Sequence, residues 1–385
     1  MGSIERVSTN VDLSHHINAK SKARHPSPLK DIIKYMGYDG MISFAGGLPH
    51  PSLFPLEEAK FSCLTPEASL AGDRKVGAEN PDILSLTLGR GASPGDLELS
   101  QFLQYDIIIV EDDPYYFLQF PGYLTPKEPT FQPKPTKEFL ENLVPTFLSM
   151  DTQGRVIRLE SFSKTLFPGI RMGYFVANPV FSERLLRATE VETQDPAGLS
   201  QALVLSLLRR WGIDGYLIWL QSLQFQYRER RDWLLDAFHA RFVVLPAAKS
   251  PVPQAQGLVA CVRAQEGGEL RPVFSFVDPG AGMFVWCKFY FDGIDEFIEM
   301  ETSGASKDPE QDFADELWKA WATELVLLTP GSYYHAWQGP DKMTTKARGA
   351  DPRTAHFRFS FATPTKDQID TGVERLSKVV ARYWR

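Results

Sequence analysis

The sequence predicts an α/β fold with a mostly parallel sheet, followed by a smaller α+β domain. Residues 107–110 (IIIV) are apolar on both faces, as in a buried parallel strand, and residues 154–159 (GRVIRL) alternate apolar and polar side chains. Residues 180–242 carry apolar side chains at helical spacing, and strand and helix patterns alternate beyond residue 270. A chain of 385 residues is long for one compact core, so we expect two domains.

The predicted elements follow in chain order. Ser27 and Pro28 are typical of a helix start, which predicts a helix over 27–36. A helix over 200–212 ends at a glycine, and a longer amphipathic helix covers 216–238. Further patterns predict strands over 282–291 and 356–362 and a helix over 308–324. We divide the chain into an N-terminal arm with the first helix (1–40), a large domain (41–235) and a small C-terminal domain (236–385).

Composition narrows the possible partners. The net charge of -7 argues against nucleic acid, and no apolar run reaches the roughly 18 residues that a membrane span requires. The three cysteines lie far apart and form no CxxC pair, and no histidine belongs to a metal-ligand pattern. We therefore expect a cytoplasmic protein without a structural metal.

Acidic residues follow the first buried strand. In open α/β sheets ligands collect at the carboxyl ends of the strands, so an acid of the motif EDDPYY (111–116) could bind a cationic group of a ligand. The alternative is an ordinary turn, because Asp-Pro is common in turns.

A lysine follows the second strand in the motif SFSK. The hydroxyls of Ser161 and Ser163 could donate hydrogen bonds to a phosphate, and Arg171 could bind the same group. Lys164 would then lie beside a phosphate ester, and a partly desolvated lysine near other cations becomes a nucleophile toward carbonyls. The alternative is a basic loop on the surface.

Together the two motifs require one ligand with a phosphate, an aldehyde and a basic ring nitrogen. Pyridoxal 5'-phosphate (PLP) has all three, and an acid held on its pyridinium nitrogen keeps the ring an electron sink.

The lysine motif also resembles a known family. Residues 161–174 (SFSKTLFPGIRMGY) resemble the lysine signature of fold-type I PLP-dependent aminotransferases. The closer resemblance is to the kynurenine/2-aminoadipate and fungal aromatic amino acid aminotransferase branch, which implies an aspartate-aminotransferase-like fold. Further matching stretches run in family order: ARHPSPLKDI, ISFAGGLPHPSLFP, IIIVEDDPYYFLQF, VPTFLSMDTQGRVIRLESFSK, DPGAGMFVWCKF, LLTPGSYY and FRFSFA.

The resemblance implies roles for the residues of the cofactor site. Lys164 would bond the cofactor aldehyde and transfer the substrate's α proton. Asp112 would pair with the pyridinium nitrogen, and Tyr115 would hydrogen-bond the phenolic oxygen. The phosphate would be held by Ser161, Ser163 and Arg171.

The resemblance also implies residues that bind the substrate. Arg358 would bind its α-carboxylate, which suits a planar guanidinium. Gly47 would lie beside the substrate, and Arg24 would reach its distal end. An exposed position in the arm is the alternative for Arg24.

One part of the family pattern is missing. Between Gln104 and Tyr105 the family has a Gly-Ser-Gln phosphate loop, an aromatic residue that stacks on the cofactor and an Asn-Pro-Thr-Gly turn. Several strand–helix units, on the order of 100 residues, are absent, so the large domain is incomplete. We expect strand 107–110 to lose neighbours and to expose backbone hydrogen-bonding groups. Arg90 also stands where the family has a tyrosine that reaches across the dimer.

These observations favour a homodimeric PLP-dependent aminotransferase. It would move an amino group from an aromatic or 2-aminoadipate-like amino acid to a 2-oxo acid, with secondary metabolism as a pathway suggested by analogy. Two alternatives stay open: a catalytically impaired pseudoenzyme or truncated form that only binds a partner or ligand, and a PLP-dependent lyase.

Overall fold

The computed structural model describes two compact units of the chain. The structure describes residues 38–45, 108–126, 130–179, 196–264, 268–336 and 343–385. It also describes isolated residues near 32–35, 50–53 and 181–193. One unit holds the described residues between His50 and Glu229, together with Gly280–Met283. The other holds the described residues up to Ala45, Arg230–Pro279 and Phe284–Arg385.

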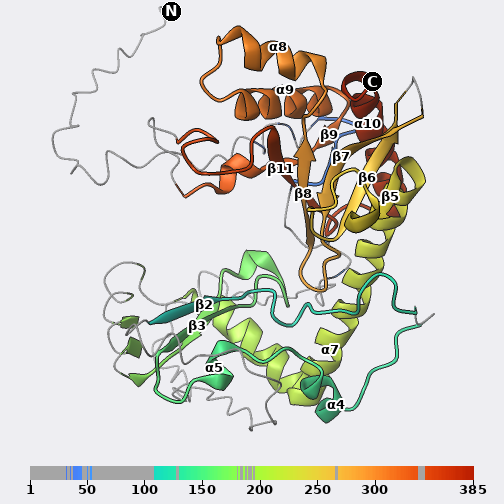
Figure 1. Ribbon diagram of the computed structural model, residues 1–385. Helices are drawn as coiled ribbons and strands as arrows, with labels where there is room; N and C mark the ends of the chain where they lie inside the picture. Colours follow the sequence, from blue (N-terminus) through green and yellow to red (C-terminus); the bar gives the residue numbers. More distant parts are fainter. Residues whose placement is uncertain are drawn as a thin grey trace, which may run out of the picture. The chain divides into compact units, whose positions relative to one another are not determined.

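The first unit contains a three-stranded sheet in the order β2-β3-β4 (Figure 1). Its strands are β2 (Ile109–Asp112), β3 (Val156–Ser161) and β4 (Gly173–Val176). β2 runs parallel to β3, and β4 runs antiparallel to β3, so the described sheet is mixed. Short helices complete this part: α4 (Thr136–Glu141), α5 (Phe147–Met150) and η4 (Pro168–Ile170).

The expectation of a buried strand over 107–110 is wrong. The side chains of β2 alternate between half-buried and exposed, and Val110 is 60% exposed. The physical reason is its position, since within the described residues β2 pairs only with β3. Within these residues β2 is thus an edge strand, whose outer backbone groups have no partner strand.

The long helix α7 (Gly198–Arg241) has a break at Gly212. The glycine has φ 65° and ψ -177°, which lies outside helical conformation, so the two predicted helices are confirmed as two segments joined there. Glycine adopts positive φ without the steric cost that a side chain would bring.

The second unit is built on a six-stranded antiparallel sheet in the order β10-β11-β8-β7-β6-β5. Its strands are β5 (Val243–Pro246), β6 (Leu258–Arg263), β7 (Leu270–Phe276), β8 (Phe284–Tyr290), β10 (Thr329–Pro330) and β11 (Thr354–Ser360). Fully buried aromatic rings from three strands, including Phe274, Phe289 and Phe359, pack against one another and form the core. A separate parallel pair joins β1 (Ile42–Ser43) to β9 (Val326–Leu327).

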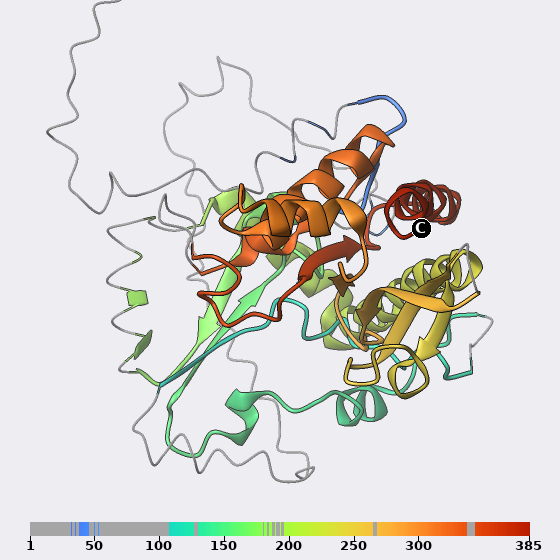
Figure 2. The same ribbon diagram turned by 45° about the horizontal axis from the view of Figure 1, so that its top comes forward.

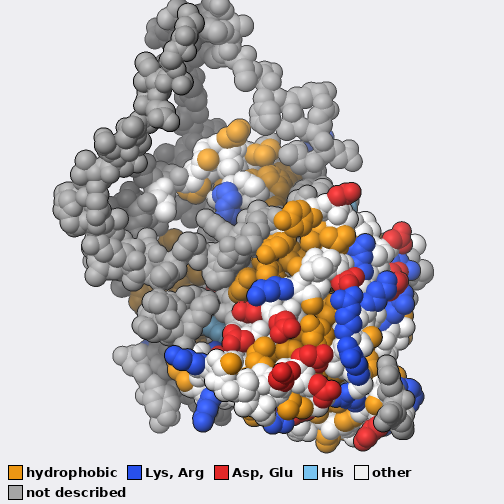
Figure 3. All heavy atoms as spheres, turned by 90° about the horizontal axis from the view of Figure 1, so that it is seen from above, with side chains coloured by type: hydrophobic (Ala, Val, Ile, Leu, Met, Phe, Trp, Pro, Cys, Tyr) orange, Lys and Arg blue, Asp and Glu red, His pale blue; other side chains and the backbone are white. Residues whose placement is uncertain are grey.

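Three helices belong to this unit: α8 (Asp295–Ser303), α9 (Pro309–Thr323) and α10 (Lys366–Tyr383). α9 lies beside α8 and α10 (Figure 2). α10 starts with a capping box in which Thr365 and Gln368 satisfy each other's backbone N–H groups. On the face shown in Figure 3, acidic and basic side chains are interspersed rather than gathered by sign.

Three sequence expectations concern the first helix, a membrane span and a metal site. The predicted helix over 27–36 lies outside them except for Ile32 and Tyr35, which are helical. Across the described ranges, no helix combines the length and the apolar character that crossing a membrane would need. In the same ranges, no group of three or more His, Cys, Asp or Glu side chains is placed to hold a metal ion.

Candidate active site

Lys164 lies in the loop that follows β3. Its amine is 5.7 Å from the centroid of the Tyr115 ring, and its side chain is half-buried. The next residue, Thr165, is buried and anchored from α7: Trp219 Nε1 donates to its carbonyl at 2.7 Å, and the Tyr216 hydroxyl bonds its Oγ1 at 3.1 Å. These bonds fix the backbone of the lysine loop, which a lysine needs in order to present its amine at one place.

The proposed phosphate ligands lie on either side of this lysine. The backbone N–H of Ser163 donates to Ser161 Oγ at 3.1 Å, which draws the start of the loop into a tight turn. Arg171 ends η4 in the left-handed conformation with φ 49°, and its side chain is exposed. Non-glycine residues in this region carry strain and concentrate at functional sites. The chain then returns as β4, where a Cβ at Gly173 would lie 2.5 Å from the Glu160 carbonyl oxygen, so only glycine fits there.

Two adjacent aspartates at the end of β2 lie in different environments. Asp112 pairs with Leu159 in the parallel register, so its exposed side chain shares a face with Ser161, two residues further along β3. Asp113 is half-buried, and burial raises the pKa of its carboxyl group above the usual range despite the opposing effect of Arg158. The sheet face that carries Ser161 therefore also carries the exposed carboxyl group of Asp112.

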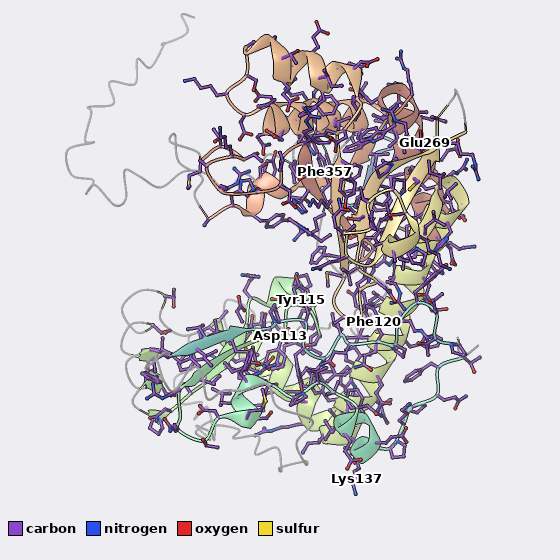
Figure 4. The ribbon with its side chains drawn as sticks, viewed as in Figure 1. Asp113, Tyr115, Phe120, Lys137, Glu269 and Phe357 are labelled. Carbon is purple, nitrogen blue, oxygen red and sulfur yellow. The ribbon has the colours of Figure 1, made fainter. Side chains whose placement is uncertain are left out.

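Tyr115 lies in a turn that is held by backbone hydrogen bonds. Leu118 N–H donates to the Tyr115 carbonyl at 2.7 Å, and Gly282 N–H donates to the Leu118 carbonyl at 2.8 Å. Gly282 has φ 75°, and a Cβ there would lie 3.9 Å from Tyr115. Figure 4 shows Asp113 and Tyr115 together on the segment after β2.

The opposite face of the same strands holds a buried ion network that the sequence analysis missed. Arg158 Nη1 lies 2.9 Å from Glu111, and its Nε donates to Glu160 at 2.6 Å. Burial raises the pKa of Glu160, and Arg158 opposes that rise. Strand alternation could have revealed the network, because Glu111 pairs with Arg158 in register and so shares its face.

Arg358 belongs to the second unit, on β11. Its guanidinium carbon lies 3.9 Å from the centroid of the Phe284 ring and 4.7 Å from that of Tyr334. Its Nη2 donates to the Ala45 carbonyl at 3.2 Å, an oxygen that also accepts from Thr329 Oγ1 at 2.9 Å. Two aromatic faces and a backbone oxygen thus hold the guanidinium in a fixed orientation, as recognition of a carboxylate requires.

Three further residues of the sequence interpretation are not placed. Gly47, Arg24 and Arg90 lie outside the described residues. Ala45, two positions before Gly47, is described and contacts Arg358.

The residues after β2 and β3 fit the chemistry of PLP. Two hydroxyls and a guanidinium suit a phosphate dianion, an amine suits an aldehyde, and a carboxylate on the same sheet face as Ser161 suits a pyridinium. Lys164 and Tyr115 are brought together directly. The individual roles remain predictions.

Comparison with known proteins gives a consistent result. No family model matches the chain. An aromatic amino acid aminotransferase of Schizosaccharomyces pombe is 39% identical over 285 residues, covering 73% of this chain and 50% of the relative. The mouse mitochondrial kynurenine/alpha-aminoadipate aminotransferase is 31% identical over 277 residues, covering 72% of this chain and 47% of that protein.

Solved structures that resemble this chain are also aminotransferases. The aminotransferase Aro8 of Candida albicans superposes with a TM-score of 0.58 at 32% identity, covering 74% of this chain and 52% of that one. LysN of Thermus thermophilus, an alpha-aminoadipate aminotransferase solved with N-(5'-phosphopyridoxyl)-L-leucine, gives 0.56 at 20% identity over 97% of this chain and 99% of that one, which speaks for the fold alone.

The chain spans about half the length of the curated relatives it matches. Its homologues are aromatic amino acid and kynurenine/aminoadipate aminotransferases, and its fold is the aspartate-aminotransferase-like fold type I.

Proposed function

We propose that this protein binds PLP at Lys164 and transfers an amino group from an amino acid to a 2-oxo acid. The observation that carries the proposal is the convergence after two neighbouring strands: the Lys164 amine lies over Tyr115, and Asp112 shares a sheet face with Ser161. The named homologues support the same reaction class.

Each residue has a definite task in this proposal. Ser161, Ser163 and Arg171 bind the phosphate, and Asp112 holds a proton on the ring nitrogen. The cofactor supplies an electron sink for the substrate's α carbon when it is bound. The Lys164 amine would accept the α proton of the amino acid in the first half of the reaction, and it would deliver a proton to the α carbon of the 2-oxo acid in the second half.

Arg358 binds the α-carboxylate of the substrate. Its guanidinium is held between Phe284 and Tyr334, so little side-chain entropy remains to be lost on binding. Gly47 and Arg24 are proposed to contact the substrate on the strength of the resemblance alone.

The test is chemical trapping. Purified protein is incubated with PLP, reduced with borohydride and digested, and the pyridoxyl adduct is mapped by mass spectrometry. We expect the adduct on Lys164 and its loss in Lys164→Ala. Lys137→Ala is the matched control, because Lys137 is an exposed lysine on α4 whose side chain is 85% exposed (Figure 4). Folded protein without an adduct on Lys164 would contradict the proposal.

The amino donor is proposed to be aromatic, kynurenine-like or 2-aminoadipate-like, as the names of the homologues suggest. Incubating the PLP-loaded protein with each donor and 2-oxoglutarate, and following the new amino acid by mass spectrometry, identifies the pair. Release of ammonia without transfer to the 2-oxo acid would indicate the lyase alternative instead.

Within the described residues β2 pairs only with β3, and this observation favours the second candidate, a protein that binds without turnover. An incomplete sheet leaves the carboxyl ends of the strands less firmly held, which a transferase tolerates poorly. Adduct formation on Lys164 without transamination of any donor would support it.

We further propose a cytoplasmic homodimer that acts in secondary metabolism. The described cysteines, Cys261 and Cys287, are buried free thiols, which suits a reducing compartment. Light scattering after gel filtration measures the mass against the 43.4 kDa of one chain.

A further inference from the structure

We propose that Arg158 is a positioning residue that fixes Asp112, the acid for the ring nitrogen, from the opposite face of the sheet. The inference rests on the proposed function, because it assigns Arg158 a task toward the same cofactor. The link runs through Glu111, which immediately precedes Asp112 on β2.

The network is almost completely buried. The side chains of Arg158, Glu111 and Glu160 are 4%, 10% and 12% exposed. Glu111 also accepts hydrogen bonds from the backbone N–H groups of Phe147 at 2.9 Å and Leu148 at 3.3 Å. Arg158 therefore joins β3 to β2, and Glu111 joins β2 to the start of α5.

Arg158 contacts the chain on both sides of Asp112. It forms the ion pair with Glu111 before Asp112, and its guanidinium carbon lies 4.6 Å from the centroid of the Tyr116 ring after it. Asp112 itself is exposed, and within the described residues its strand has a neighbour on one side only. Asp112 thus depends on these contacts for a defined position more than a central-strand residue would.

The composition of the network argues against a role in stability alone. Three carboxyl groups, on Glu111, Glu160 and Asp113, surround one guanidinium. Arg158 Nη2 is buried without a hydrogen-bond partner among the residues that the structure describes. A buried donor without a partner costs free energy, so apolar side chains could stabilise this site at least as well. What the ion pairs add here is a defined connection between β2 and β3.

The experiment compares PLP binding with thermal unfolding in the full-length chain. PLP is titrated into the wild type, Arg158→Met, Arg158→Lys and Glu111→Gln, and the visible absorbance and induced circular dichroism of the lysine-bound chromophore are recorded. Phe139→Leu is the stability control, because Phe139 is a buried residue of α4, an element that contributes no side chain to the ion pairs of Arg158. Arg155→Met is the charge control, because Arg155 immediately precedes β3 and its Nε donates to the Gln153 side chain at 3.0 Å.

We expect Arg158→Met to weaken PLP binding by at least about tenfold and to change the dichroism, because a displaced acid no longer meets the ring nitrogen. Glu111→Gln should show a smaller loss in the same direction, and Arg158→Lys a partial recovery. Both controls should bind PLP as the wild type does, even if Phe139→Leu lowers the melting temperature as much as Arg158→Met does.

Two results would overturn the inference. If Arg158→Met and Glu111→Gln bind PLP with wild-type affinity and dichroism, the network is structural only, while the proposed function stands. If Arg158→Met does not fold, Glu111→Gln alone decides between these outcomes. A folded wild-type chain that forms no chromophore with PLP would overturn both proposals together.

Discussion

At the residue scale, the environment of His356 changes the acidity of its imidazole. Burial, reinforced by the Lys288 ammonium, lowers the pKa of His356 from 6.5 to about 4. Its ring stacks on Trp286 at 5.6 Å between centroids, and Asp351 and His335 are the other charged or titratable groups that act on it. The folded state therefore favours a neutral imidazole.

This shift predicts a pH dependence of stability. Between pH 6.5 and about 4 the unfolded chain binds a proton at this site that the folded chain does not, so stability falls as pH falls through that window. The loss from this one group should reach about 2 to 3 kcal/mol. His356→Gln should flatten the slope of unfolding free energy against pH, measured by urea denaturation. Parallel slopes for the two proteins would show that His356 is not responsible.

At the element scale, the break in α7 depends on one residue. Gly212→Ala should destabilise the protein by about 1 to 2 kcal/mol, because alanine pays a steric cost at positive φ. A Cβ at Gly212 would meet nothing within 4 Å, so the loss reports backbone conformation alone. Gly198→Ala is the matched control, since its Cβ would also meet nothing and its φ is not positive. Equal unfolding free energies for both variants would argue against a fixed break.

Local patterns were sufficient for most elements. The predicted helix over 308–324 is confirmed as α9, and the strands over 282–291 and 356–362 as β8 and β11. The position and burial of β2 were not predictable, because burial of an apolar run depends on neighbours elsewhere in the chain. The ion pairs of Arg158 were not predicted for a related reason. Single charges on two strands reveal their pairing only once the register of the strands is known.

The residues of the candidate site were read mainly from motif spacing. The sequence could not reveal that Asp112 and Asp113 occupy opposite environments, since adjacent acids look alike until a strand assigns them to faces. Nor could it reveal that Phe284 and Tyr334 flank Arg358. These residues stand 74 and 24 positions before Arg358 in the chain, and they meet it only once the sheet has formed.

At the scale of the whole molecule, the two units differ in how their strands are protected. β8 lies inside a six-stranded sheet and carries the fully buried Cys287 and Phe289, whereas β2 is the edge strand of a three-stranded sheet in the part of the chain that the structure describes. The backbone amides of β8 should therefore exchange slowly with solvent deuterium. Those of β2 should exchange at least about tenfold faster. Hydrogen exchange followed by mass spectrometry measures both. Equal protection of the two strands would mean that β2 has a partner beyond the described residues.

A second measurement at this scale concerns the open edge. Val110→Lys places a charge on the exposed face of β2, where Val110 is 60% exposed. Lysine on an edge strand discourages pairing with other chains, so the variant should aggregate more slowly on heating while its unfolding free energy changes by no more than about 0.5 kcal/mol. Static light scattering during a thermal ramp provides the comparison with wild type.

The hydrogen bond from Trp219 to Thr165 has an optical consequence. The indole is tied to the residue next to Lys164 and lies 5.7 Å from the Trp211 ring. Light absorbed by either indole can pass to a chromophore formed on that lysine, whose absorption overlaps tryptophan emission. Binding of PLP should therefore quench the tryptophan fluorescence of the chain. The variant Trp219→Phe would identify the share of this quenching that comes from the Trp219 ring.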